Sequence, residues 1–232
     1  MDIFAYMSTK GRYDSTLPLA LVSLTQQTLL PKEFVLFDDN IPQIDLRKNP
    51  LYQYIFGLLE FKGIKWSVVY GEGKGQVLNH NKAIDICKLP YLFRMDDDNI
   101  LEPNVLEVLA SHMTDKVGAA APLVLHPNQH IHNLPSHFSH NKIEFCEDPS
   151  QLNIQWFTHP DGKVKSVDHL YSVFMYRSDV AKQVGGYCKE LSPKGHREES
   201  IFSYSIKRAG YDLLVVPSAR VYHFRYSGGI RS

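Results

Sequence analysis

Three things are scarce in this 232-residue sequence: surplus positive charge, cysteine and long apolar runs. Its 25 lysines and arginines are balanced by 25 aspartates and glutamates. Proteins that bind nucleic acid normally carry a basic excess, so the composition disfavours a nucleic-acid partner without excluding a local basic patch. The three cysteines, Cys87, Cys146 and Cys188, form no C-x-x-C pair, which argues for free thiols in a reducing compartment.

The scarcity of long apolar runs bears on where the protein works. The N-terminus, MDIFAYMSTKGRYD, has no charged region followed by a long apolar stretch, so no signal peptide is visible. No uncharged apolar stretch approaches the length of a membrane span. Hydrophobic residues still make up 44% of the chain, enough for a sizeable core. We therefore expect a single cytoplasmic domain without an integral membrane segment.

Apolar runs and helical patterns alternate along the first half of the chain. We expect strands over residues 2–7, 33–37, 64–70, 91–95 and 117–121. We expect helices over residues 17–27 and 76–88, and a third that opens at Pro103, whose missing N–H costs nothing in a first turn. This order predicts an α/β fold with a mixed, mostly parallel central sheet flanked by helices.

The second half of the chain is less regular. Residues 122–170 are polar and weakly periodic, which is typical of a functional or mobile insertion. A strand and a short helix starting near Ser178 follow within 171–187. A helix over 197–209 and strands over 213–216 and 220–224 complete the pattern.

Two acidic clusters directly follow expected strands. Asp38 and Asp39 end the second strand, and Asp96–Asp98 end the fourth. In a parallel sheet, ligands collect at the carboxyl ends of the strands. Asp96 and Asp98 are two residues apart and would face the same way on a strand, where paired carboxylates suit Mg²⁺ or Mn²⁺. The alternative is a solvated loop whose acids cap a helix.

Two further motifs leave their interpretation open. The segment GEGKGQ (71–76) matches neither a dinucleotide fingerprint nor a Walker loop, so a flexible strand-to-helix turn is favoured over a loop that brings Lys74 to a phosphate. Glu198 and Glu199 begin the 197–209 helix. Acids in that position either complement the helix dipole or, kept ionised by it, act as a general base.

The histidines are unevenly distributed. One stretch, without a cysteine pair, contains His126, His130, His132, His137 and His140. It favours a polar acceptor-binding loop over a zinc site. His223 lies alone at the end of an apolar strand, where a structural role is the ordinary one.

Taken together, these features resemble the family-two glycosyltransferases of the GT-A fold. Four segments carry the resemblance, in order along the chain: residues 7–40, 78–103, 174–187 and 195–225. They are similar to a strand–helix–strand unit ending in paired aspartates, an asparagine-bearing helix with an aspartate-x-aspartate motif, a strand–helix unit, and an acidic pair heading a helix. The resemblance implies one GT-A domain over residues 1–232. Residues 1–121 would bind a nucleotide-sugar, and 122–232 would supply the acceptor site and the catalytic base.

The resemblance also assigns roles to residues. Ser8, Thr9 and Arg12 would line the nucleotide pocket, and Asp38 and Asp39 would approach the base, with Asp39 on the uracil edge. Asp96 and Asp98 would hold ribose and metal, with Asp98 as the direct ligand. Lys74, Asn81 and Asp97 complete the expected nucleotide-binding set. Glu199 would be the catalytic base, and His223 would contact metal or diphosphate.

Two positions depart from the family pattern. Glu199 stands where the family usually has aspartate, which leaves open whether Glu198 or Glu199 is the base. Asn79-His80-Asn81 lacks the arginine that members often have before the second asparagine, a role that Lys74 or Arg225 would then take.

The implied reaction is transfer of one sugar from a UDP-sugar to a hydroxyl acceptor, by direct displacement with inversion and with Mn²⁺ or Mg²⁺. The acceptor would be a glycan, a lipid-linked glycan or another hydroxyl compound. The chain ends soon after Arg225, which favours addition of a single sugar. Two alternatives stay open: a non-catalytic protein that binds a sugar-nucleotide or glycan, and a metal-dependent nucleotidyltransferase or phosphohydrolase.

Overall fold

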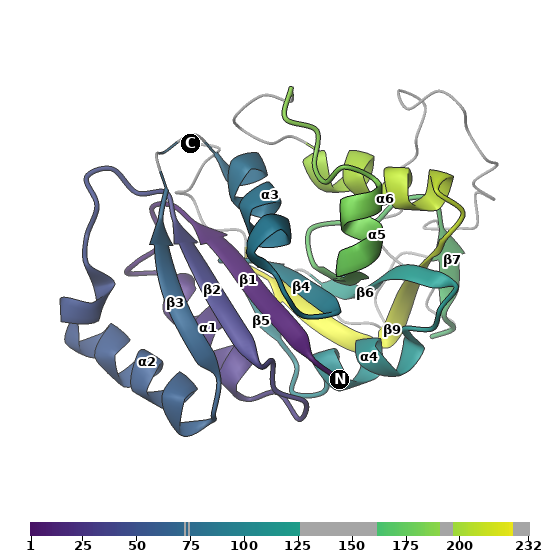
Figure 1. Cartoon of the computed structure of the whole chain (residues 1–232). Coiled ribbons are helices and arrows are strands. Elements are labelled where there is room, and N and C mark those ends of the chain that lie inside the picture. The colour runs from purple at the N-terminus through teal and green to yellow at the C-terminus, as the bar shows by residue number, and fades with distance from the viewer. Residues whose placement is uncertain (72, 74, 126–161, 191–196, 225–232) are drawn as a thin grey trace.

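The computed structural model describes residues 1–71, 73, 75–125, 162–190 and 197–224. These residues form a nine-stranded sheet with helices on both faces (Figure 1). The strands are β1 (Ile3–Thr9), β2 (Glu33–Asp38), β3 (Lys65–Tyr70), β4 (Tyr91–Asp96), β5 (Asn99–Leu101), β6 (Val117–Leu125), β7 (Lys165–Val167), β8 (Phe174–Arg177) and β9 (Asp212–His223). The helices are α1 (Leu17–Thr25), α2 (Pro50–Phe61), α3 (Gln76–Ile86), α4 (Val105–His112), α5 (Ser178–Gln183) and α6 (Glu198–Arg208), with a 3₁₀ turn η1 (Leu46–Lys48).

The sheet is mixed, with the order β3-β2-β1-β4-β8-β6-β9-β5, and β7 pairs with β9. Strands β3, β2, β1 and β4 run parallel, as expected for strands joined through helices. β8 is antiparallel to both of its neighbours, whereas β6 and β9 are parallel to each other. The predicted α/β fold with a mostly parallel central sheet is confirmed.

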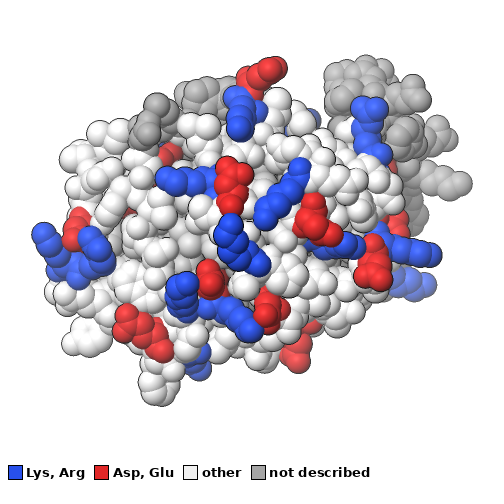
Figure 2. All heavy atoms as spheres, in the orientation of Figure 1, with Lys and Arg blue, Asp and Glu red and all other residues white. Residues whose placement is uncertain are grey.

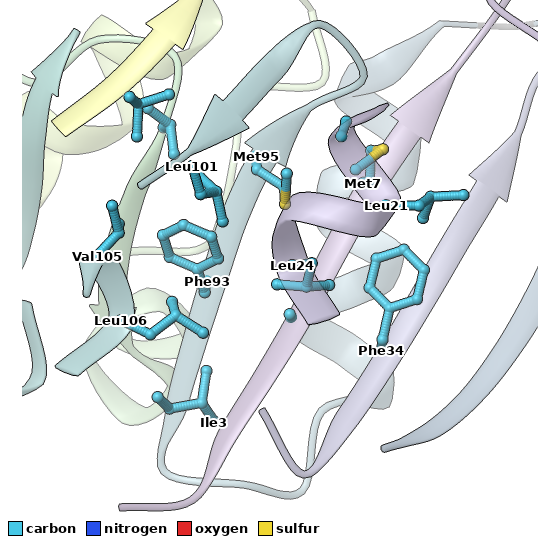
Figure 3. Packing of buried hydrophobic residues seen from close by; sticks show 14 of the residues in the cluster. Ile3, Met7, Leu21, Leu24, Phe34, Phe93, Met95, Leu101, Val105 and Leu106 are labelled. Carbon is cyan, nitrogen blue, oxygen red and sulfur yellow. The ribbon is translucent and has the colours of Figure 1, made fainter. Parts of the chain in front are cut away.

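One face of the sheet is covered by α1, α2 and α4. Apolar side chains from these helices pack on alternate strand residues, and Figure 3 shows Leu21 and Leu24 of α1 beside Phe34, and Leu106 beside Phe93. The other face is covered by α3, α5 and α6, whose Val77, Val180 and Phe202 belong to a second cluster of buried residues. Because both faces are covered, the central strands are apolar on both sides.

Helix α2 was not anticipated, although its sequence contains the signals. Tyr52, Ile55, Phe56 and Leu59 are buried at helical spacing. Asn49 caps the helix by accepting a hydrogen bond from Leu51 N, and Pro50 occupies the first turn.

Three expectations about element bounds were wrong. Helix α4 begins at Val105 and not at Pro103, whose carbonyl instead accepts a hydrogen bond from Thr28 N. The two strands expected near the C-terminus are one strand, β9, with a register shift against β6 that leaves residues 217–219 out of the pairing. The region expected to be irregular includes the end of β6 and all of β7, because these strands pair with β9.

Several sequence-level expectations concern residues outside the described ranges, including Lys74, the histidines from 126 to 140, and Arg225. Cys87 is a buried free thiol and Cys188 an exposed one. No helix in the described ranges has the length and apolarity needed to cross a membrane. Figure 2 shows acidic and basic side chains interspersed on the visible face, in keeping with the balanced composition.

Candidate active site

The carboxyl ends of β1, β2 and β4 bring both acidic clusters to one edge of the sheet. Ser8 is the register partner of Asp96, and Thr9 is the partner of Asp38. Residues that are 29 to 88 positions apart in the sequence are therefore neighbours here. This edge is where ligands bind in parallel sheets.

Asp38 and Asp39 are both buried and have different partners. Asp38 accepts hydrogen bonds from the Tyr13 hydroxyl and, at 3.0 and 2.7 Å, from the backbone and side chain of Asn40. Asp39 accepts a hydrogen bond from Gly75 N at 2.9 Å, and its own N–H donates to Thr9 O. Asp39 therefore connects the end of β2 to the glycine-containing segment before α3.

Gly71 allows this close approach. A Cβ added at Gly71 would lie 1.9 Å from Asp39 Oδ1, a distance that no side chain tolerates. Gly73 and Gly75, with φ of 69° and 100°, then turn the chain into α3. Gly71 and Gly75 thus lie against Asp39 between the end of β3 and the start of α3.

The three aspartates at the end of β4 have separate partners. Asp96 lies 3.5 Å from Arg94 Nη2. Asp97 accepts hydrogen bonds from Thr9 Oγ1 at 2.7 Å and from Lys10 N at 3.4 Å. Asp98 lies between Arg12 and His223, with Arg12 Nη2 3.2 Å from its Oδ2 and His223 Nε2 3.3 Å from its Oδ1. Asp97 and Asp98 fall in a turn after β4, so strict strand alternation does not apply to Asp98.

Burial and mutual repulsion act on these carboxyls. Burial, followed by the negative charge of Asp98, raises the pKa of Asp97 to about 7. Burial also raises the pKa of Asp96, against the opposing effect of Arg94. The raised pKa values show that the charges of Asp96 and Asp97 are incompletely compensated, an arrangement that a positive ligand would relieve.

Asp98 and His223 are the residues that fit a divalent metal. Strand pairing brings them together, because Asn99 is the register partner of His223 and Phe224 N donates to Asp98 O at 2.9 Å. Ligands about 2.1 Å from an octahedral ion lie about 3 Å apart, close to the observed 3.3 Å. Among the described residues, no group of three or more His, Cys, Asp or Glu side chains could hold a metal.

Glu198 and Glu199 open α6 but have different surroundings. Glu198 Oε1 accepts hydrogen bonds from Arg94 Nη2 at 2.9 Å and Gln76 Nε2 at 2.6 Å. Burial opposes its ionisation, but the neighbouring His80 ring, 3.8 Å away, and Arg94 lower the pKa of Glu198 to about 2. Burial and the adjacent Glu198 charge instead raise the pKa of Glu199 to about 8. The second carboxylate oxygen, Oε2, has no hydrogen-bond partner among the described residues in either glutamate.

Two asparagines of α3 have roles that the sequence did not distinguish. Asn81 exchanges two 2.9 Å hydrogen bonds with the backbone of Tyr187, so its amide is occupied by the protein itself. Asn79 Nδ2 donates to Ser8 Oγ at 2.8 Å, next to the strand end. The placement therefore argues against Asn81 as a nucleotide ligand and brings Asn79 to the site.

Sequence reasoning also missed Arg94 and His80. Arg94 is a charge within the apolar strand YLFRM, and a charge in such a position needs a buried partner; that was the available signal. His80 is buried in contact with the ring of Tyr187, and burial lowers the pKa of His80 to about 4, so it is neutral at pH 7.

Comparison with known proteins gives a family and a fold. The model of the family described as glycosyl transferase family 2 matches residues 5–178. No curated protein matches the chain. The chain is similar to GalNAc-T7 in a structure with UDP, GalNAc and Mn²⁺, with a TM-score of 0.67 and 18% identity, covering 97% of this chain and 43% of that one.

A second similar structure is S. aureus TarS 1–349 in complex with UDP-GlcNAc. Its TM-score is 0.67 and its identity 15%, covering all of this chain and 61% of that one. The chain therefore spans about half the length of these solved structures. At such low identity the similarity establishes the GT-A fold, and the substrates named are those of the other proteins.

Proposed function

Because this chain belongs to glycosyl transferase family 2, we propose that it transfers a single sugar from a UDP-sugar to a hydroxyl acceptor. The observation that carries the proposal is the strand register, which places both acidic clusters at one carboxyl edge. The UDP and UDP-GlcNAc in similar structures support the choice of donor. The acceptor would be a glycan, a lipid-linked glycan or another hydroxyl compound.

For the nucleotide, we propose a pocket at the ends of β1, β2 and β4. Ser8, Thr9 and Arg12 would line it, Asp38 and Asp39 would lie toward the base, and Asp39 would accept from the uracil edge. Asp96 would bind ribose hydroxyls. Asp97, which is bonded to Thr9 and Lys10, would hold the pocket wall in place. Lys74 remains a predicted phosphate contact, whereas Asn81 is left out because its amide is already bonded.

For the metal, we propose that Asp98 and His223 hold Mn²⁺ or Mg²⁺ together with donor phosphate oxygens. The ion would offset the negative charge that develops on the departing UDP. Arg12, 3.2 Å from Asp98, would orient the carboxylate. The Mn²⁺ in the GalNAc-T7 structure supports this choice of ion.

For the base, we propose Glu199. Its carboxylate takes the proton of the acceptor hydroxyl as that oxygen attacks the anomeric carbon of the donor sugar. The bond between the anomeric carbon and the phosphate oxygen breaks, and its electron pair leaves with UDP. A direct displacement of this kind inverts the anomeric centre. Glu198 is the weaker candidate because Arg94 and Gln76 already engage its carboxylate.

The division of the chain follows from these roles. The proposed nucleotide residues come from 1–121, whereas the proposed base and second metal ligand come from 122–232. The described free thiols, Cys87 and Cys188, support a cytoplasmic location.

The test is incubation of the purified protein with a panel of nucleotide-sugars and Mn²⁺ while UDP release is measured. We expect UDP release from a UDP-sugar, stimulated by the correct acceptor. Release of pyrophosphate or inorganic phosphate would instead indicate a nucleotidyltransferase or a phosphohydrolase. Binding without turnover of any donor would indicate a non-catalytic protein.

A further inference from the structure

Arg94 is a buried cation in the interior of β4. Its side chain and that of Glu198 are each 1% exposed, and Nη2 donates to Glu198 Oε1 at 2.9 Å. Nη1 lies 3.3 Å from the Tyr187 hydroxyl. Either charge left alone at this depth would be strongly unfavourable, so the two residues depend on one another.

Aromatic rings fix the direction in which Arg94 points. Its guanidinium carbon lies 5.8 Å from the ring centre of Phe174 and 5.6 Å from that of Tyr187. Tyr187 in turn stacks on Phe202 of α6 with ring centres 4.1 Å apart. A strand of the nucleotide half is thereby joined to the first turns of α6 by an ion pair and by a stack of rings.

The carboxyl, imidazole and guanidinium groups that act on Glu198 and Glu199 come from three elements. Arg94 and Asp96 approach from β4, His80 approaches from α3, and Glu198 and Glu199 belong to α6 itself. His80 is neutral, so Arg94 is the one cation among these five groups. It contacts Glu198 directly, and no hydrogen bond joins it to Glu199 among the described residues. Arg197, immediately before α6, is exposed, and the Tyr187 hydroxyl contacts Arg94.

We propose that Arg94 is a positioning residue for glycosyl transfer: by pairing with Glu198 it orients the first turn of α6 and leaves Glu199 as the single carboxylate available for the acceptor proton. Without Arg94, two adjacent buried carboxylates would compete for one proton, as coupled acids do. This inference rests on the proposed function, since it assigns the roles within the proposed catalytic pair.

The pH dependence of kcat/KM distinguishes positioning from mere structural support. In the wild type, kcat/KM should rise with pH in a single step near pH 8, where Glu199 ionises; this ascending part of the profile is called the limb below. In Arg94→Met this single rise in activity should become a two-step rise, because Glu198 and Glu199 then share a proton, and kcat should fall about tenfold or more. Arg94→Lys, which keeps the charge, should retain a single limb. Loss of folded protein alone would scale the profile without changing its shape.

Two further variants keep the inference testable. Glu198→Gln removes the negative charge next to Glu199, so the single limb of this variant should lie at lower pH than in the wild type. This variant tests the inference if Arg94→Met does not fold. Arg177→Met, which breaks an exposed ion pair with Asp179 on β8 and α5, is the matched control and should leave the profile unchanged.

Folded Arg94→Met with the wild-type kcat and a single limb in the wild-type position would overturn the inference, as would an unmoved limb in Glu198→Gln. Absence of UDP release by the wild type would instead overturn the proposed function.

Discussion

Adjacent residues in this chain can have opposite electrostatic surroundings, as Glu198 and Glu199 illustrate. Both are buried, but only Glu198 accepts hydrogen bonds from Arg94 and Gln76. Their pKa values therefore move apart, one to about 2 and the other to about 8. The sequence predicts an acidic pair at a helix start. It cannot predict which member is paired, because the pairing depends on a residue 104 positions away.

Replacing Glu199 with glutamine should stabilise the protein in alkaline solution. The folded state raises the pKa of Glu199 from 4.5 to about 8, so its contribution to stability is complete below pH 4.5 and is lost as the pH rises through 8. Glu199→Gln removes that loss. We expect the difference in Tm between variant and wild type to grow from pH 6 to pH 9 in thermal melts. A constant difference over that range would contradict the assignment.

Removing one partner of the buried ion pair should destabilise the protein more than removing both. Glu198→Gln leaves Arg94 without its main counter-charge, and we expect a loss of about 3–5 kcal/mol in the free energy of unfolding. The double variant Arg94→Met/Glu198→Gln leaves no unpaired charge and should be more stable than either single variant, Arg94→Met or Glu198→Gln. Urea denaturation measures all three; additive losses would contradict direct coupling.

At the scale of elements, two glycines between β3 and α3 are constrained by the side chain of Asp39, which directly follows β2. Gly71 is required by Asp39, and Gly75 donates to the same carboxylate. The sequence shows the glycines of this segment. It does not show why glycine is needed there, because Asp39 is more than 30 residues earlier. The same holds for β5, β7 and the continuous β9, which depend on pairing between distant strands.

Gly71→Ala should weaken binding of UDP without unfolding the protein. The added Cβ displaces Asp39, and loss of one hydrogen bond to a charged group should weaken binding about tenfold or more. Calorimetric titration with UDP measures the change. The matched control is Gly57→Ala in α2, where a Cβ meets nothing within 4 Å. That substitution should raise stability by about 0.5–1 kcal/mol and leave UDP binding unchanged. Equal affinity of both variants for UDP would contradict the role given to Asp39.

At the scale of the whole molecule, the sheet gathers residues that the sequence scatters. The β-α-β rhythm, the strand-end location of the acids and the family resemblance were all visible in the sequence. The contact of His223 with Asp98 was implied by the resemblance alone, and β5–β9 pairing supplies its physical cause. The burial of Arg94 against α6 was not anticipated, because no local pattern encodes which helix covers a strand.

Binding of UDP should stabilise the whole domain, and Mn²⁺ should add to the effect. At about 100 times its Kd, UDP adds about 2.7 kcal/mol, which raises Tm by about 5–10 °C for a domain of this size. In Asp98→Ala the increment due to Mn²⁺ should disappear while some UDP-induced shift remains. An unchanged Mn²⁺ increment in this variant would contradict Asp98 as a metal ligand.

The most direct test of the central claim compares wild type with Glu199→Gln in two assays on the same preparations: release of UDP from the preferred UDP-sugar in the presence of acceptor, and calorimetric binding of that donor with Mn²⁺. We predict that the variant loses transfer by at least about 100-fold, the contribution typical of a general base, while its donor affinity stays within about threefold of the wild type. Full transfer activity in Glu199→Gln would contradict the account.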